Sequence, residues 1–325
     1  MSHVLAVDVG GSKLAVALLD GTGRVVRAQR APTPQGPRAT AEPIWDTLDD
    51  LVTTLVAEGA DGDSEISGVG IGCGGPMAWP LGDVSPLNIP GWRDFPLRTR
   101  MAERFSGVPV RLHNDAVCLA VGEHWRGAGR GRRDMLGMVV STGVGGGLIL
   151  DGHLVDGADG NAGHIGHVVV DPDGPSCACG GQGCLEAIAS GPMLTRWAQQ
   201  QGWRPPSSGG EAVTARDIAD DARRGHPVAL AAMQRAGRAL GIAIASATHL
   251  LNLEVVSIGG GLSQAGPLLF GPLEDALRRY ARLSFAQSVR VVPATLGQDA
   301  GLVGAAGLVL AGDTYWNPLP GDGER

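Results

Sequence analysis

The sequence has few charged residues and no excess of basic ones. Only 18% of its 325 residues are charged, and the formal net charge is −7. Proteins that hold nucleic acid through its phosphates carry a basic surface, so this charge balance argues against a nucleic-acid-binding protein. Hydrophobic residues make up 43% of the chain, which is typical of a globular protein and excludes a long disordered tail. The length suits two lobes, each with its own core.

Signals for export and for a membrane span are also missing. The N-terminus has neither a basic segment nor a small-residue cleavage site, so we expect a cytoplasmic protein. The most apolar stretch, residues 239–261, is interrupted by His249, Asn252, Glu254 and several glycines. A membrane-spanning helix would have to bury these polar groups, so we expect no membrane contact. The stretch is interpreted as a core helix followed by a buried strand.

The five cysteines are odd in number and unevenly placed, which argues against a disulfide framework. Cys177, Cys179 and Cys184 fall in one short stretch, whereas the other two stand alone. Together with His167 they offer one imidazole and three thiolates, the donor set of a closed tetrahedral zinc site. The sequence therefore predicts a structural zinc on these four residues. A catalytic zinc is disfavoured, because four protein ligands leave no vacant position.

Hydrophobic periodicity predicts an α/β organisation that occurs twice along the chain. The pattern of the first half starts again at Met135, which indicates a diverged duplication. Residues 157–190 show no periodicity and are too many for an idle loop, so we expect them to be functional or held by a metal. The tail after Ala311 is expected to fray. Strands are expected at residues 4–9, 14–19, 66–73, 109–112, 135–140 and 255–258, with one more strand that follows the glycine turn at 141–147 and ends at residue 150. Helices are expected at residues 41–58, 97–105, 116–125 and 301–310.

Glycine runs follow three of the expected strands. Glycine lets backbone amides approach an anion closely, and nearby hydroxyls add neutral donors, so the turns could together cradle a nucleotide. The alternative is that each run only makes a tight turn. Neither the P-loop spacing nor the Gly-x-Gly-x-x-Gly fingerprint occurs at these strand ends, which favours another phosphate-binding design. The runs are Gly10-Gly11 before Ser12, Gly143 with Gly145–Gly147 after Ser141-Thr142, and Gly259–Gly261.

These motifs, taken in order with Asn114-Asp115 and the cysteine loop, resemble the ROK family of sugar kinases and repressors. The resemblance implies a two-lobed actin-like ATPase (ribonuclease H-like) fold of the α/β class with a zinc-stapled loop. Residues 1–113 and a C-terminal segment of about 300–325 would form a small α/β lobe. Residues 114–299 would form a large α/β lobe with the zinc loop and the nucleotide-binding elements. A homodimer or homotetramer is also expected.

The same resemblance implies Mg-ATP as cofactor, with Asp8 assisting magnesium and Gly259-Gly260 lining the adenosine. It also implies that the zinc-bearing histidine contacts the sugar through its other ring nitrogen. The residues implied for ATP are Asp8, Gly10, Gly11, Ser12, Lys13, Ser141, Thr142, Gly143, Gly145, Gly259 and Gly260. Those implied for the sugar are Gly75, Asn114, Asp115, His164, His167 and Glu186.

Asp115 is the expected catalytic base. Phosphoryl transfer to an alcohol needs a group that accepts the hydroxyl proton, and a carboxylate at a strand end can do so. The family places its catalytic aspartate in the same Asn-Asp pair. The alternative from the residues alone is that Asn114-Asp115 only caps the helix that begins at Ala116.

His164 is where the chain departs from the common family pattern. Many members, glucokinases among them, have Glu-x-Gly-His where this chain has His164-Ile165-Gly166-His167. The surrounding residues look most like bacterial N-acetylmannosamine kinases, so phosphorylation of the 6-hydroxyl of N-acetylmannosamine is expected first. Glucose, or another modified aminosugar such as kanosamine, is the alternative. A ROK repressor would need a winged-helix segment before the first strand, and a sugar sensor without catalysis would lose the base or the glycine turns, so both are disfavoured.

Overall fold

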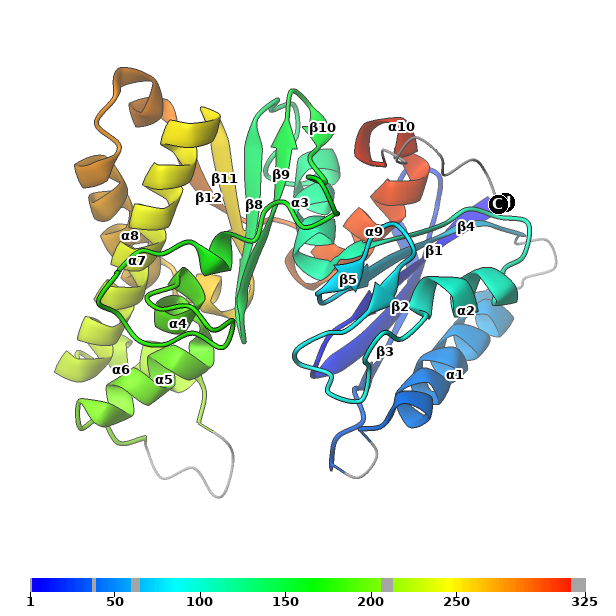
Figure 1. Cartoon of the computed structure of the whole chain (residues 1–325), viewed down its shortest axis with the longest axis horizontal. Coiled ribbons are helices and arrows are strands. Elements are labelled where there is room, and N and C mark those ends of the chain that lie inside the picture. The colour runs from blue at the N-terminus through cyan, green and yellow to red at the C-terminus, as the bar shows by residue number, and fades with distance from the viewer. Residues whose placement is uncertain (1, 37–38, 60–64, 206–212, 317–325) are drawn as a thin grey trace. The chain divides into compact units, whose positions relative to one another are not determined.

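The computed structural model describes residues 2–36, 39–59, 65–205 and 213–316 (Figure 1). The chain forms two compact units. Unit 1 comprises Met1–Arg133, Gly147–Gly163 and Thr295–Arg325, and unit 2 comprises Asp134–Gly146 and His164–Ala294. The lobe limits expected from the sequence, 1–113 with 300–325 against 114–299, stay a prediction.

The first sheet has the strand order β3-β2-β1-β4-β7. Strand β1 runs antiparallel to β2 and parallel to β4, which in turn is parallel to β7. The strands expected at residues 4–9 and 14–19 form the β1–β2 hairpin, and the predicted succession of strands and helices is confirmed. Its strands are β1 Ser2–Val9, β2 Lys13–Leu19, β3 Val25–Pro32, β4 Glu65–Cys73 and β7 Val110–Asn114; the helices of unit 1 are α1 Ala41–Gly59, α2 Leu97–Arg104, α3 Asp115–Arg126, α9 Ala300–Leu310 and α10 Gly312–Tyr315.

The second sheet repeats this order as β10-β9-β8-β11-β12. Strand β8 corresponds to β1, and β11 and β12 lie parallel beyond it as β4 and β7 do beyond β1. The structural echo between the two halves is therefore confirmed. The strands are β8 Met135–Val140, β9 Val144–Leu150, β10 His153–Leu154, β11 Val255–Gly259 and β12 Arg290–Pro293; the helices of unit 2 are α4 Leu185–Ala189, α5 Gly191–Gln200, α6 Ala215–Arg223, α7 Pro227–Leu251 and α8 Pro267–Tyr280.

Strand β4 shows how the sequence brings helices against the first sheet. Alternate residues of a strand face opposite sides, and here one side carries only glycine at 68, 70 and 72. A Cβ atom on Gly70 would lie 1.8 Å from the backbone oxygen of Ala305 in α9, and one on Gly72 would lie 3.2 Å from Cys118 Sγ in α3. Helices α3 and α9 can therefore approach the sheet only because these side chains are absent.

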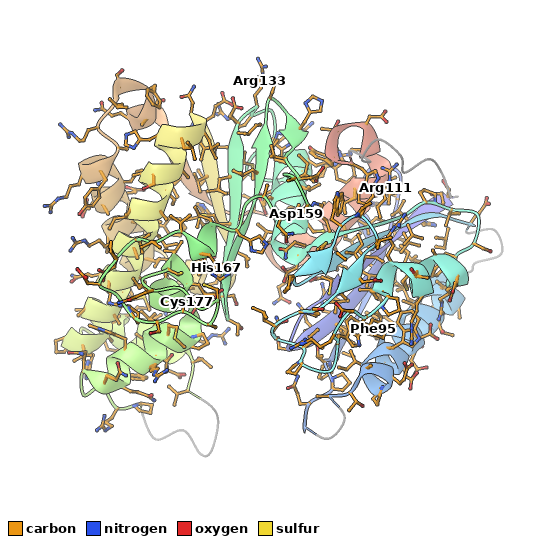
Figure 2. All side chains as sticks on the ribbon, viewed as in Figure 1. Phe95, Arg111, Arg133, Asp159, His167 and Cys177 are labelled. Atoms are coloured by element: carbon orange, nitrogen blue, oxygen red, sulfur yellow. The ribbon has the colours of Figure 1, made fainter. Side chains whose placement is uncertain are left out.

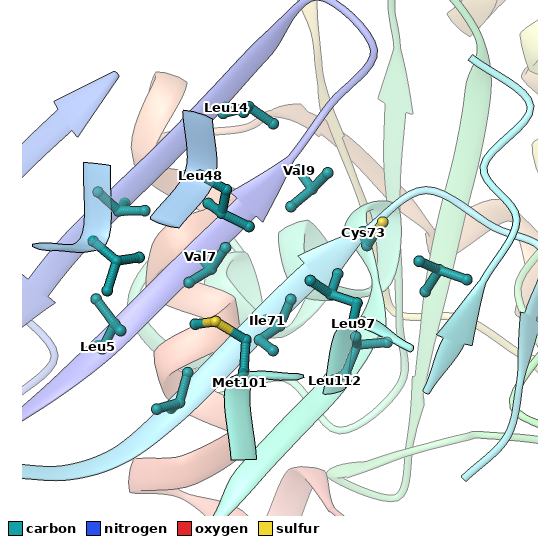
Figure 3. Packing of buried hydrophobic residues seen from close by; sticks show 14 of the residues in the cluster. Leu5, Val7, Val9, Leu14, Leu48, Ile71, Cys73, Leu97, Met101 and Leu112 are labelled. Atoms are coloured by element: carbon teal, nitrogen blue, oxygen red, sulfur yellow. The ribbon is translucent and has the colours of Figure 1, made fainter. Parts of the chain in front are cut away.

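The opposite face of β4 carries the apolar core of unit 1. Figure 3 shows Val7 of β1 and Ile71 of β4 among the buried side chains, with Leu48 of α1 and Met101 of α2 packed against them. All four are at most 1% exposed. Each fully buried aliphatic side chain contributes on the order of 1.5–3 kcal/mol, so this core fixes the strands whose ends carry the polar motifs.

Helix α7 is the core helix of unit 2. Among the described residues it is long and apolar enough to span a membrane by length and composition, but most of its apolar stretch is buried inside the protein. Gly237 and Gly241 let α8 approach it, since Cβ atoms there would lie 2.6 Å and 2.4 Å from backbone oxygens of α8. The expectation of a core helix followed by a buried strand is confirmed by α7 and β11.

Two expectations about irregular segments are wrong in part. Residues 157–190 contain a 3-10 turn, Ile165–His167, and the short helix α4, which the glycine-rich composition concealed. Beyond Ala311 the chain forms α10, where the hydroxyl of Tyr315 lies 2.6 Å from His124 Nδ1. This buried contact orders a segment that was expected to fray. The rest of that segment, from residue 317, lies outside the described residues.

Candidate active site

Two carboxylates stand at the ends of strands β1 and β7 in unit 1, which lie on either side of β4 in the first sheet. Asp8 is near the end of β1, and Asp115 directly follows β7. Burial raises the pKa of Asp8 to about 7, and the negative charge of Asp115 adds to that rise. Burial likewise raises the pKa of Asp115. Both side chains keep some solvent access, so the pair can meet a ligand. Such a pair favours binding of a cation, which would relieve the repulsion between the two charges.

The turn between β1 and β2, which contains Gly10 and Gly11, follows Asp8 closely in the sequence. A Cβ atom on Gly11 would lie 2.7 Å from the Cβ atom of Asn88, so only glycine fits there. The hydroxyl of Thr33 donates to the Gly10 carbonyl at 2.6 Å, and the Gln35 amide donates to the Gly11 carbonyl at 2.9 Å. The turn is therefore held in one conformation, with the predicted Ser12 side chain exposed beside it.

Asn114 and Asp115 both cap α3. The Asn114 side chain and the Asp115 carboxylate each accept a hydrogen bond from the Ala116 amide, at 2.9 Å and 2.8 Å. Helix capping, the alternative considered from the residues, is thus present. It leaves the second carboxylate oxygen of Asp115 available for chemistry. A Cβ atom on Gly75 would lie 3.2 Å from Asn114 Nδ2, so this predicted sugar contact adjoins the pair.

In unit 2 the second glycine turn packs directly on Glu186. The amide of Val144 donates to Glu186 Oε2 at 2.8 Å, and a Cβ atom on Gly143 would lie 2.7 Å from the same oxygen. A Cβ atom on Gly166 would lie 2.0 Å from the Val144 carbonyl oxygen, so the His164–His167 turn reaches the same place. The second glycine turn, Glu186 and the His164–His167 turn, which are far apart in the sequence, therefore converge at Val144.

A cavity of about 1050 Å³ opens in unit 2 beside the second and third glycine runs. Ser141, Thr142 and Gly261 line it together with residues from α5 and α6. Gly260 has a φ of +88°, and a Cβ atom there would lie 2.4 Å from the Val140 carbonyl oxygen, so a glycine is required at this turn. The volume of the cavity is only slightly above the usual range for small-molecule sites, so the cavity is large enough for a nucleotide.

The Cys and His residues picked out by spacing form one cluster in unit 2. His167 and Cys177 lie on neighbouring parts of the same loop (Figure 2). The ligand atoms of His167, Cys177, Cys179 and Cys184 all lie within 4.8 Å of one another. Two pairs, Cys179 Sγ with Cys184 Sγ and Cys177 Sγ with His167 Nδ1, are each 3.8 Å apart. Thiolates about 2.3 Å from one tetrahedral ion are separated by about this distance, so the cluster could hold zinc.

His164 lies next to this cluster and is exposed. Its ring stacks on that of His167, with centroids 6.0 Å apart and an angle of 20° between the planes. Because Nδ1 of His167 faces Cys177, its Nε2 is directed away from the cysteines. The two imidazoles thus form a polar surface next to the candidate metal site.

The structure adds residues that the sequence analysis did not single out. Thr33 and Gln35 brace the first glycine turn, and Thr195, Arg196 and Arg216 line the cavity of unit 2. The first two follow β3, an exposed strand without apolar periodicity, and therefore gave no signal. For the helix of Arg216, the Thr214 and Asp217 capping box was a recognisable start signal.

The comparisons with known proteins agree with one another. The profile of the ROK family matches residues 4–311. The chain is 37% identical over 315 residues to a glucokinase of Thermotoga maritima, which covers 94% of this chain and 96% of the relative. It is 34% identical over 306 residues to an N-acetylmannosamine kinase of Yersinia pestis, which covers 94% of this chain and 98% of the relative.

Similarity to solved structures supports the same assignment. A ROK family glucokinase from Streptomyces griseus, in complex with glucose and AMPPNP, matches with a TM-score of 0.79 and 34% identity over 94% of this chain and 98% of that one. The predicted fold class, an α/β fold of the actin-like ATPase class, is confirmed by this match. The chain therefore belongs to the ROK family and is a sugar kinase.

Proposed function

We propose that this sugar kinase transfers the γ-phosphate of Mg-ATP to the 6-hydroxyl of a hexose or amino-hexose, with Asp115 as the base. The observation that carries the proposal is the carboxylate of Asp115, which is buried at a strand end, has a raised pKa and lies beside Asp8. A base with a pKa above its ordinary value accepts a proton from an alcohol more readily. The glucose and AMPPNP bound to the Streptomyces griseus relative support the choice of reactants.

The reaction then has one bond made and one broken. The sugar O6 attacks the γ-phosphorus as its proton passes to Asp115, the bond between the γ-phosphorus and the bridging β-oxygen breaks, and ADP leaves. Asp8 would hold magnesium directly or through water, because its carboxylate is the second negative group at the strand ends. The predicted phosphate and adenosine contacts are Gly10, Gly11, Ser12, Lys13, Ser141, Thr142, Gly143, Gly145, Gly259 and Gly260.

The Cys and His cluster would bind a structural zinc. In the absence of a cation, burial raises the pKa of Cys184 to about 12, so the free thiol is protonated. Zinc binds cysteine as thiolate, and its binding free energy would stabilise a loop with little apolar material of its own. The loop so ordered carries His167, whose Nε2 could contact the sugar, and precedes Glu186.

The sugar is proposed to be N-acetylmannosamine first and glucose second. The absence of the usual glutamate at His164 favours a sugar whose ring substituents do not need that acceptor. Glucose stays a strong candidate, because the Thermotoga maritima glucokinase is at least as similar to the chain as the Yersinia pestis N-acetylmannosamine kinase. The repressor alternative is not favoured, because these curated relatives are kinases. A cytoplasmic location and a homodimer or homotetramer also stay predictions.

One assay separates these readings. Purified protein is incubated with Mg-ATP and, in turn, N-acetylmannosamine, glucose, mannose, N-acetylglucosamine, kanosamine or allose, while ADP release is followed. We expect the highest kcat/KM for N-acetylmannosamine, with a 6-phosphate in the product. A tenfold preference corresponds to about 1.4 kcal/mol of differential transition-state binding. Highest kcat/KM for glucose would replace the proposed substrate, and no ADP release with any sugar would reject the proposed reaction.

A further inference from the structure

We propose that His113 and Asp156 form a positioning pair that aligns the sugar-binding segments of unit 1. This inference rests on the proposed function, in which Asn114 and Asp115 face the sugar. His113 is the residue immediately before them and is fully buried, with an exposed fraction of 0%. Neither residue of the pair is assigned a contact with sugar or nucleotide, yet together they connect segments that are 43 positions apart in the sequence.

The hydrogen bonds of His113 fix its tautomer. The Asn114 amide donates to Nδ1 at 2.8 Å, so Nδ1 carries no proton. The proton of the neutral ring is therefore on Nε2, which lies 3.0 Å from Asp156 Oδ1 and donates to it. The Asp156 side chain is only 11% exposed. Both ring nitrogens are thus satisfied by a single arrangement, in which the backbone at Asn114 and the carboxylate of Asp156 are held on either side of one imidazole.

A tryptophan joins a third segment to the pair. The ring of Trp79 lies 4.9 Å, centroid to centroid, from that of His113. A Cβ atom on Gly160 would lie 2.7 Å from the Trp79 ring, so the chain after Asp156 packs against the same indole. Trp79 closely follows Gly75, and residues 156–163 lead directly into His164. The cluster therefore connects the segment after Gly75, the strand end with the base and the segment that leads to the histidine motif.

A polar pair is not needed merely to fill this buried space. A buried imidazole without partners costs about 1–3 kcal/mol, whereas an apolar side chain would fill the same space without that risk. What the pair supplies instead is a defined direction for the Asn114 amide and a defined position for the loop after Asp156. Small displacements of reactant-binding groups can cost about 100-fold in rate, so such alignment has a functional consequence.

The test compares Asp156→Ala with Asp156→Asn. The asparagine oxygen can still accept from His113 Nε2, whereas alanine removes the acceptor. With N-acetylmannosamine and glucose as probes, we expect Asp156→Ala to weaken sugar binding by about tenfold or more in calorimetry, with the KM for ATP changed by less than about twofold. Asp156→Asn should restore most of the sugar affinity. Unchanged sugar affinity in folded Asp156→Ala, or equal losses for sugar and ATP, would overturn the proposal.

A second pair of variants keeps the test decisive if Asp156→Ala fails to fold. Gly160 and Gly152 both have positive φ angles, +76° and +81°, but a Cβ atom on Gly152 would meet nothing within 4 Å. Gly160→Ala should therefore weaken sugar binding, whereas Gly152→Ala should not. Equal sugar affinities for both variants would overturn the proposal. The turnover of Asp115→Asn is measured alongside, so that a failure of the proposed function can be distinguished from a failure of this inference. Full turnover by Asp115→Asn would reject the proposed base. Unchanged sugar affinity in Asp156→Ala would reject only the positioning pair.

Discussion

The raised pKa of Asp8 predicts a stability that falls as pH rises when no divalent cation is present. Burial raises this pKa from 3.8 to about 7, with a further rise from Asp115. Both states are protonated at low pH, but above pH 3.8 the unfolded chain releases its proton first. The folded state therefore binds more protons, and its free energy of unfolding decreases with pH until Asp8 ionises in the fold as well.

The size of the effect follows from the width of this window. One pKa unit corresponds to about 1.4 kcal/mol, so a rise of about three units gives an upper limit of about 4 kcal/mol. About two thirds of the window lies between roughly pH 5 and pH 8. Because Asp8 keeps some contact with solvent, which screens its charge, we expect about 1 kcal/mol in that range. For a chain of this length this is about 1–2 °C in Tm.

The assay is thermal unfolding of the wild type and Asp8→Asn in chelator-treated buffer at both ends of that range. The asparagine has the same size and no charge, so its Tm advantage over the wild type should grow with pH. Asp20→Asn is the matched control, because hydrogen bonding by Thr22 lowers the pKa of Asp20 to about 2, below the range tested. A Tm difference between Asp8→Asn and the wild type that is independent of pH, or that shrinks as pH rises, would refute the reasoning.

Three further predictions concern the packing, the metal and the sugar. Gly304→Ala should destabilise the fold by about 3 kcal/mol in urea unfolding, because the added Cβ atom would lie 1.6 Å from the Cys118 carbonyl oxygen. Gly271→Ala is the control and should be nearly neutral, because a Cβ atom there would meet no other atom within 4 Å. Zinc should copurify at about one ion per chain, and Cys179→Ser should lower both zinc content and sugar affinity; zinc-free wild type with normal sugar affinity would contradict this. His164→Glu should shift relative kcat/KM towards glucose by about tenfold in competing-substrate kinetics, and an unchanged ratio would reject the specificity role.

The sequence was informative where one segment carries its own signal. The spacing of the three cysteines was enough to predict a cluster with His167, and the ligand atoms of these four residues lie within 4.8 Å of one another. The Asn114-Asp115 pair was correctly placed between a strand and a helix, because apolar periodicity changes there. The glycine runs were identified as turns for the same local reason.

Elements without such a local pattern were missed. Half of the residues of β3 are exposed and none is fully buried, and β12 has only four residues at a sheet edge, so neither shows apolar alternation. Helix α8 contains Pro272, which is tolerated where it packs against Gly237 of α7. The contact between His113 and Asp156 depends on the register of the fold and on no local motif. Long-range packing, which a single segment does not reveal, decides these features.

The most direct test of the proposed chemistry is the turnover of Asp115→Asn. The amide oxygen of asparagine can still accept from the Ala116 amide, as Asp115 Oδ1 does at 2.8 Å, so the cap of α3 is retained while the proton acceptor is lost. ADP release with saturating sugar and Mg-ATP should fall by about 100-fold to 10,000-fold, with sugar affinity from calorimetry within about twofold of the wild type. Turnover close to that of the wild type in a folded, sugar-binding Asp115→Asn protein would contradict the assignment of the base.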